Sequence, residues 1–215
     1  MNQEEYLQSL LSNPSAAVKK MESDAEEQRV PIMEPLGIDF LMQLLRIQQP
    51  KKILEIGTAI GYSALRMLEA CPESQIITVE RDEQRYKDAL KNIKEMNAEN
   101  QIRVIHGDAL EVASTIDKEG PFDLLFIDAA KGKYEEFFHM YSPMVSDKGV
   151  ILSDNVLFKG FVADDSEASP RMAKIANKIR RFNKWLVQHP DYYTTIVPIG
   201  DGVAITKKKE IEKQL

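Results

Sequence analysis

The chain of 215 residues has little of what builds disulfide frameworks or zinc sites. Its single cysteine, Cys71, excludes an intramolecular disulfide and any multi-cysteine metal site. The three histidines, His106, His139 and His189, are scattered without metal-ligand spacing, which argues against zinc.

Long apolar runs are also missing, and none approaches the roughly 20 residues of a membrane-spanning helix. The first eleven residues carry acids and no apolar core, unlike a signal peptide. We therefore expect a cytoplasmic protein with no membrane partner. The net charge of -6 argues against a surface coated with positive charge for nucleic acid, but not against a local basic patch.

Internal repeats and low-complexity linkers are absent as well. The length suits one domain with a substantial core. We expect a single domain over 1–215, in which 1–48 form an N-terminal helical cap and 49–215 form an α/β core.

From residue 51 onward, apolar runs typical of buried strands alternate with segments of helical spacing. The runs are Ile53–Ile56, Ile76–Val79, Ile102–Ile105, Leu124–Ile127 and Val150–Leu152. The helical segments are 62–70, 82–97, 108–117, 133–142 and, later, about 168–188. This alternation predicts a Rossmann-like parallel sheet with right-handed crossovers. Two further alternating runs, Tyr192–Val197 and Gly202–Thr206, predict a hairpin and hence one antiparallel strand.

The first strand leads into a helix through a loop with two glycines, Gly57 and Gly61. Glycine lets the backbone turn tightly and lets a ligand approach it, and the helix directs free N–H groups at the loop. The G-x-x-x-G spacing differs from the G-x-G-x-x-G of dinucleotide sites and suits an adenosyl ligand without a pyrophosphate. Glu55, an acid in an apolar strand, needs a partner. The amine-bearing end of S-adenosylmethionine would be one.

Acids also follow the next two strands. Glu80 is placed to accept hydrogen bonds from both hydroxyls of a ribose, although a glutamate at a strand end is common and only the glycine loop makes it informative. Asp108 could accept the adenine amino group, cap the next helix, or do both.

The fourth and fifth strands end in oxygen-bearing side chains. Asp128 follows one strand, and Asp154 and Asn155 follow the other, at the carboxyl edge where such sheets keep their active sites. Three hard oxygen donors suit a magnesium-like ion. The alternative is that the two acids cap helices and the amide makes a turn. Lys131 lies near this set and could remove a proton from an acceptor hydroxyl, or could be a solvated surface lysine.

Together these motifs resemble those of the cation-dependent O-methyltransferases, the group that contains the catechol and caffeoyl-coenzyme A enzymes. The resemblance covers about residues 30–206. It implies a seven-stranded methyltransferase sheet, mostly parallel with one antiparallel strand. It also implies methyl transfer from S-adenosylmethionine to a hydroxyl held on Mg²⁺ or another divalent cation. By position, the family's cofactor contacts fall on Ile32, Glu55, Gly57, Ser63, Glu80, Asp108, Ala109 and Asp128. The metal ligands fall on Asp128, Asp154 and Asn155, and the general base falls on Lys131.

Within that group the chain is most similar to the bacterial tRNA 5-hydroxyuridine methyltransferases, which implies the tRNA anticodon loop as partner. The 5-hydroxyl and C4 carbonyl of 5-hydroxyuracil are neighbouring oxygens, as in a catechol, so one metal can chelate both. Small residues at Ala129, Ala130 and Gly160 would leave the wide mouth that a flipped base needs. A small catechol-like phenol is the alternative acceptor. A nicotinamide-binding or non-enzymatic Rossmann protein is the rival from another class.

Two further features concern partners. Basic residues recur at 3–4 spacing at Arg171, Lys174, Lys178 and Arg181, with Lys184 continuing the row. Such a row is usually a solvated helix face, and its functional interpretation is a phosphate-binding ridge. Phe158, Lys159 and Phe161 could contact phosphate or stack on a base. The N-terminal apolar residues Tyr6, Leu7, Leu10 and Leu11 could form a homodimer face or cap the active site.

Overall fold

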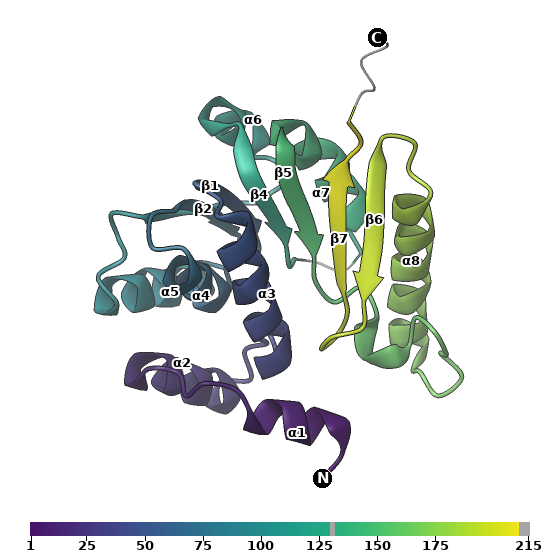
Figure 1. Cartoon of the computed structure of the whole chain (residues 1–215), viewed down its shortest axis with the longest axis horizontal. Coiled ribbons are helices and arrows are strands. Elements are labelled where there is room, and N and C mark those ends of the chain that lie inside the picture. Colours follow the sequence, from purple (N-terminus) through teal and green to yellow (C-terminus); the bar gives the residue numbers. More distant parts are fainter. Residues whose placement is uncertain (130–131, 211–215) are drawn as a thin grey trace.

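Seven strands form one sheet in the order β3-β2-β1-β4-β5-β7-β6 (Figure 1). The structure, a computed structural model, describes residues 1–129 and 132–210. The strands are β1 (Lys52–Ile56), β2 (Gln75–Glu80), β3 (Ile102–His106), β4 (Phe122–Ile127), β5 (Val145–Ser153), β6 (Tyr192–Val197) and β7 (Val203–Lys208). Pairing is parallel from β3 through β5, and β7 runs antiparallel to both β5 and β6. The predicted mostly parallel sheet with one antiparallel strand is confirmed.

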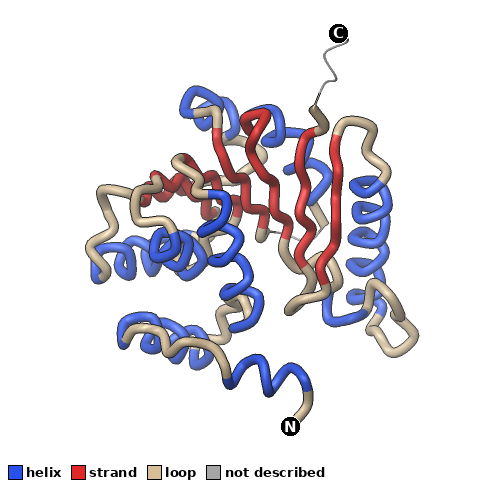
Figure 2. The backbone as a smooth tube through the Cα atoms, in the orientation of Figure 1, coloured by secondary structure: helices blue, strands red, loops and turns tan. Residues whose placement is uncertain are grey.

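Helices cover both faces of this sheet (Figure 2). They are α1 (Gln3–Ser9), α2 (Ala16–Glu27), α3 (Pro35–Gln48), α4 (Tyr62–Ala70), α5 (Glu83–Glu95), α6 (Ala113–Ile116), α7 (Tyr134–Tyr141) and α8 (Pro170–Val187). Short 3₁₀ turns are η1 (Asp117–Glu119), η2 (Ser142–Met144) and η3 (Phe158–Gly160). No helix in the described ranges is both long and apolar enough to cross a membrane.

Successive residues of the central strands point into two different cores. Ile53 of β1 packs with residues of α2 to α5, whereas its neighbour Leu54 packs with residues of α6 to α8. Strands buried on both faces are expected to be continuously apolar, which is why the sequence shows runs rather than alternation. Val18 and Met21 of α2 and Leu41 of α3 share the core of Ile53. The N-terminal helices other than α1 are therefore part of the main core.

Two predicted elements differ in extent. The segment 108–117 was expected to be one helix, but α6 begins only at Ala113. Asp108 instead makes a tight turn, in which its Oδ1 accepts the N–H of Leu110 at 2.9 Å and its carbonyl accepts the N–H of Glu111 at 2.8 Å. Strand β5 begins at Val145, five residues earlier than expected, because its polar first half carries no apolar signal.

Candidate functional site

A cavity of about 450 Å³ opens at the carboxyl ends of β1 to β5, the edge where the sequence placed the site. Most of the predicted cofactor contacts line it: Ile32, Gly57, Ser63, Glu80, Asp108, Ala109 and Asp128. Ile32 comes from the segment between α2 and α3, and Asp108 and Ala109 come from the turn after β3. The structure thus gathers residues from six separate parts of the chain around one space.

The glycine loop forms the floor of this cavity. Gly57 has φ +106°, and a Cβ there would stand 2.1 Å from the carbonyl oxygen of Asp128, so only glycine lets these two segments touch. Gly61 is also left-handed, with φ +84°, and caps the N-terminus of α4. The backbone N–H groups at the start of α4 are consequently free to face a ligand.

Glu80 is held rigidly at the end of β2. Its Oε2 accepts the N–H of Ala59 and its Oε1 accepts the N–H of Asp82, both at 2.8 Å. Each carboxylate oxygen keeps further acceptor capacity. A carboxylate fixed in this way on a cavity wall can accept hydrogen bonds from a vicinal diol. Ala59, whose left-handed backbone has φ +46°, contributes through its N–H, and residue type alone does not reveal that role.

Glu55, a cofactor contact that the resemblance implies, does not line the cavity, and that role stays a prediction. Its side chain is fully buried, and it accepts hydrogen bonds from Ser63 and, at 2.5 Å, from Thr78. Thr78 is joined in turn to Thr58 at 2.6 Å. Of this cluster, Ser63 and Thr58 reach the cavity wall. Glu55 therefore orients a hydroxyl that faces the cavity, that of Ser63.

Burial raises the pKa of Glu55 from its ordinary value of 4.5 to about 7, although the bonds from Ser63 and Thr78 work against this shift. The folded protein thus keeps the Glu55 proton up to near neutral pH, while the unfolded chain releases it near 4.5. The folded state binds more protons in that window, so the free energy of unfolding should fall by about 3 kcal/mol as the pH rises through it.

Replacing Glu55 by Gln should remove that decline. In urea unfolding, the free energy of unfolding of the variant should exceed that of the wild type at pH 8 and should differ little from it at pH 5. Glu73→Gln, a substitution at an exposed position between α4 and β2, is the matched control and should leave the pH dependence unchanged. If the wild type and the Glu55→Gln variant lost equal stability between pH 5 and pH 8, the raised pKa of Glu55 could not be the cause of the loss.

The three predicted metal ligands lie together. Asp128 and Asp154 follow adjacent strands, and backbone bonds tie each of them to the neighbouring strand: Asp128 N–H to Ile56 and Asp154 N–H to Ile127, both at 3.0 Å. Asn155 has a left-handed backbone with φ +60°. That conformation turns its amide back, so that Nδ2 lies 2.5 Å from Asp154 Oδ2 and 3.4 Å from Asp128 Oδ1. Their role as ligands stays a prediction.

The donor set fits a hard divalent cation. Two carboxylates and one amide converge, and a half-turn of the Asn155 amide would direct its oxygen to the same point. The region is electronegative: the pKa of the buried Tyr134 is raised well above its usual value, first by burial and then by Asp128, Asp154 and Asp201. Within 1–129 and 132–210, no group of three His, Cys, Asp or Glu side chains could hold a metal ion, and the set described here combines two carboxylates with one amide.

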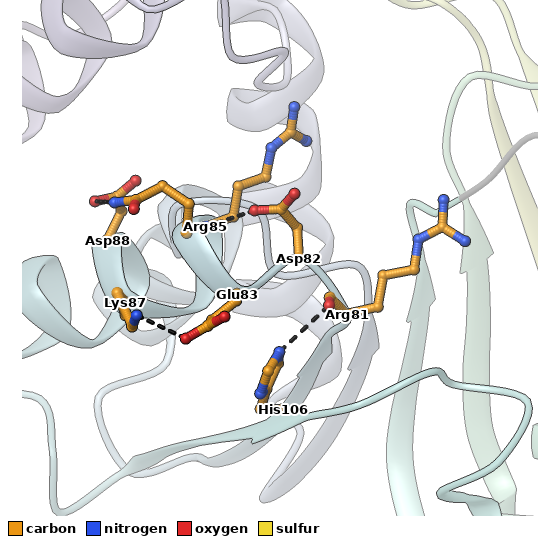
Figure 3. A network of polar contacts seen from close by, with 8 residues as sticks. Arg81, Asp82, Glu83, Arg85, Lys87, Asp88 and His106 are labelled. Atoms are coloured by element: carbon orange, nitrogen blue, oxygen red, sulfur yellow. Dashed lines mark hydrogen bonds and ion pairs between the residues drawn. The ribbon is translucent and has the colours of Figure 1, made fainter.

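Lys131, the predicted general base, lies outside the described residues, as does Ala130. Three other cations line the cavity without having been predicted: Arg81, Arg85 and Lys133. Arg81 directly follows Glu80, and Arg85 lies in the first turn of α5; in Figure 3 both guanidinium groups extend away from the polar contacts of Glu83, Lys87 and His106. Two arginines four residues apart after a strand-end acid were a visible signal in the sequence.

The loop after Asn155 is less accessible than expected. Phe158 is buried, at 8% exposure, and packs edge-on against Phe161 with 5.9 Å between ring centroids. Phe158 is thus unable to offer a free ring face to a base. Lys159 is exposed and has a left-handed backbone with φ +55°, and its N–H donates to Asp201 at 3.1 Å.

Comparison with known proteins agrees with this geometry. A family model described as O-methyltransferase matches residues 8–209. Catechol O-methyltransferase from Niastella koreensis is 32% identical to this chain over 210 residues, which cover 93% of each chain.

Two solved structures share the fold over nearly the whole chain. A Staphylococcus aureus protein provisionally named as a caffeoyl-CoA O-methyltransferase is 36% identical, with a TM-score of 0.90, covering 95% of this chain and 98% of that one. An O-methyltransferase from Bacillus cereus in complex with S-adenosylhomocysteine is 27% identical, with a TM-score of 0.82, covering 95% and 96%. These matches contradict the rival interpretation as a nicotinamide-binding or non-enzymatic protein. The chain is therefore an enzyme of the O-methyltransferase family, as the sequence motifs indicated.

Proposed function

We propose that this enzyme transfers a methyl group from S-adenosylmethionine to the 5-hydroxyl of 5-hydroxyuridine at the wobble position of tRNA, forming 5-methoxyuridine. The observation that carries the proposal is the position of Asp128. Its side chain lies on the wall of the 450 Å³ cavity and also next to the amide of Asn155, which is bonded to Asp154. Asp128 thus borders the space for the methyl donor and also belongs to the predicted set of cation ligands.

The cavity supports S-adenosylmethionine as the donor. Glu80 would accept both ribose hydroxyls, and the turn at Asp108 and Ala109 would enclose the adenine. Because Gly57 has no Cβ, its loop lies directly against the backbone of Asp128, and both segments line the cavity in which the rest of the cofactor would lie. The Bacillus cereus neighbour, bound to S-adenosylhomocysteine, shares this fold. Bound S-adenosylmethionine supplies an electrophilic methyl group.

Asp128, Asp154 and Asn155 would hold a divalent cation such as Mg²⁺. When bound there, the cation lowers the proton affinity of the acceptor hydroxyl. Lys131 would take the hydroxyl proton, and the cavity wall would hold acceptor and donor in line. No covalent enzyme intermediate is needed, so positioning and electrostatics carry the catalysis.

The neighbouring oxygens of 5-hydroxyuracil favour the tRNA acceptor, since they imitate a catechol. A small catechol-like phenol is the second candidate, favoured by the relative from Niastella koreensis, which is named a catechol O-methyltransferase. The tRNA acceptor places the enzyme in the cytoplasm.

Comparing wobble nucleosides of tRNA from cells with and without the gene tests the acceptor. Deletion should replace 5-methoxyuridine by 5-hydroxyuridine, and a copy of the wild-type gene should restore it. An unaltered nucleoside profile, together with methylation of catechol by the purified enzyme, would transfer the assignment to phenols.

We also propose that the enzyme is a homodimer. Helix α1 has no buried residue, and Tyr6, Leu7 and Leu10 are exposed on it and just after it. In Figure 1, α1 extends away from the sheet near the N-terminus, where a second copy could cover it. Light scattering on the purified protein should give the mass of two chains, and a mass of one chain would refute the proposal.

A further inference from the structure

One face of α8 carries a row of cations that the catalytic scheme does not use. Arg171, Lys174, Lys178 and Arg181 are all exposed, and their 3–4 spacing sets them along one side of the helix. In the described part of the chain, none of the four takes part in a salt bridge, although their neighbour Arg180 pairs with Asp165 at 3.4 Å. A protein of net charge -6 thus keeps four neighbouring positive charges on one surface.

This row passes next to the candidate active site. The Nζ of Lys178 lies 3.1 Å from the position that a Cβ on Gly132 would take. Gly132 belongs to the loop that begins with Asp128 and leads from β4 into α7. Lys178 also lowers the pKa of Glu136 on α7, after the larger effect of Lys133. The row therefore runs beside the loop that carries a predicted cation ligand.

The row continues into a half-exposed aromatic cluster. Trp185 lies one turn beyond Arg181, at the same helical spacing. Its ring packs against Phe138 and His139 of α7, Phe182 of α8 and His189 beyond the end of α8, with 4.9 Å between the ring centroids of Trp185 and His139. His139 is exposed. Cations followed by an accessible aromatic surface are the combination that binds single-stranded nucleic acid, in which phosphates pair with the cations and bases stack.

We infer that the α8 face formed by Arg171, Lys174, Lys178 and Arg181 binds the phosphate backbone of an RNA acceptor, and that the exposed ring of His139, packed on Trp185, offers a stacking surface at its end. The inference rests on the proposed function and deepens it. From Arg171 to Arg181 the helix rises by about 15 Å, which matches roughly four phosphates of one strand. RNA fits better than an anionic membrane because the row is linear and runs beside the loop of the predicted cation ligand Asp128, where a flipped nucleotide would have to present its base.

The test reverses two charges of the row in the full-length enzyme, as Lys174→Glu with Arg181→Glu. Lys178 is left in place because it contacts the active-site loop. The matched control is Lys94→Glu with Lys118→Glu, two exposed lysines on α5 and η1, away from α8. Both proteins are compared with the wild type for melting temperature, for binding and methylation of a tRNA carrying 5-hydroxyuridine, and for methylation of the free nucleoside.

We expect the α8 variant to lose at least about tenfold in kcat/KM for tRNA, mainly through KM, and to show a salt dependence of binding reduced by about two phosphate contacts. Methylation of the free nucleoside, melting temperature and the control variant should be unchanged. Wild-type affinity for tRNA in the α8 variant would overturn the inference while leaving the proposed function intact. Failure of the wild type to methylate the tRNA would instead overturn the proposed function. Loss of binding only to phosphatidylserine vesicles would assign the row to membranes and overturn the RNA inference.

Discussion

Replacing Asp154 by Asn should abolish methyl transfer while leaving the protein folded. The asparagine has nearly the same shape, and its side-chain oxygen can still accept the 2.5 Å bond from Asn155. Only the negative charge that would hold the cation is lost. Residues that merely orient metal ligands commonly cost 10–100-fold when changed, so loss of a ligand should lower kcat by at least about 100-fold.

Folding should not suffer from this change. The pKa of Tyr134 is raised first by burial and then by Asp128, Asp154 and Asp201, which indicates that negative charge is concentrated there. Removing one charge relieves repulsion, so the melting temperature should stay equal or rise. Affinity for S-adenosylhomocysteine, measured by calorimetry, should be nearly unchanged, because Asp154 is not on the cavity wall.

A matched control lies at the other end of the same strand. Asp147 of β5 is 87% exposed and pairs with Lys208 at 2.7 Å, so Asp147→Asn should keep full activity. A chelator such as EDTA should inactivate the wild type, and Mg²⁺ should restore it. Full activity of Asp154→Asn, or of the wild type in excess chelator, would refute the cation site.

Replacing Gly57 by Ala should damage both the fold and the cofactor site. The new Cβ would stand 2.1 Å from the carbonyl oxygen and 2.8 Å from the carbonyl carbon of Asp128, and neither backbone atom can move without displacing β4. Left-handed strain at φ +106° adds to this overlap. The two effects together should lower the free energy of unfolding by more than about 3 kcal/mol.

Gly160→Ala separates strain from overlap. Gly160 is also left-handed, with φ +82°, but a Cβ there would meet nothing within 4 Å. Its cost should be the conformational strain alone, about 1–2 kcal/mol. Urea unfolding and calorimetric titration with S-adenosylhomocysteine should show a large loss of both stability and affinity for Gly57→Ala alone. Equal losses in the two variants would show that the close approach to Asp128 is unimportant.

Most of the candidate site was predictable because its residues sit at strand ends. A parallel sheet brings the carboxyl ends of its strands to one edge, so Gly57, Glu80 and Asp128 had to converge once the strands were recognised. Phe158 shows the limit of such reasoning. An aromatic residue on a polar loop looks available for stacking, yet its ring turns inward against Phe161.

The order of strands and helices, the glycine loop and the oxygen-bearing strand ends could be predicted from the amino-acid sequence, because these depend on local spacing and on residue chemistry. Which side chains line the cavity depends on tertiary packing instead. The carboxylate of Glu55 accepts hydrogen bonds from Ser63 and Thr78 and does not line the cavity. The packing of α8 brings Lys178 next to Gly132. Both outcomes depend on contacts between segments far apart in the chain, and local patterns carry no information about such distances.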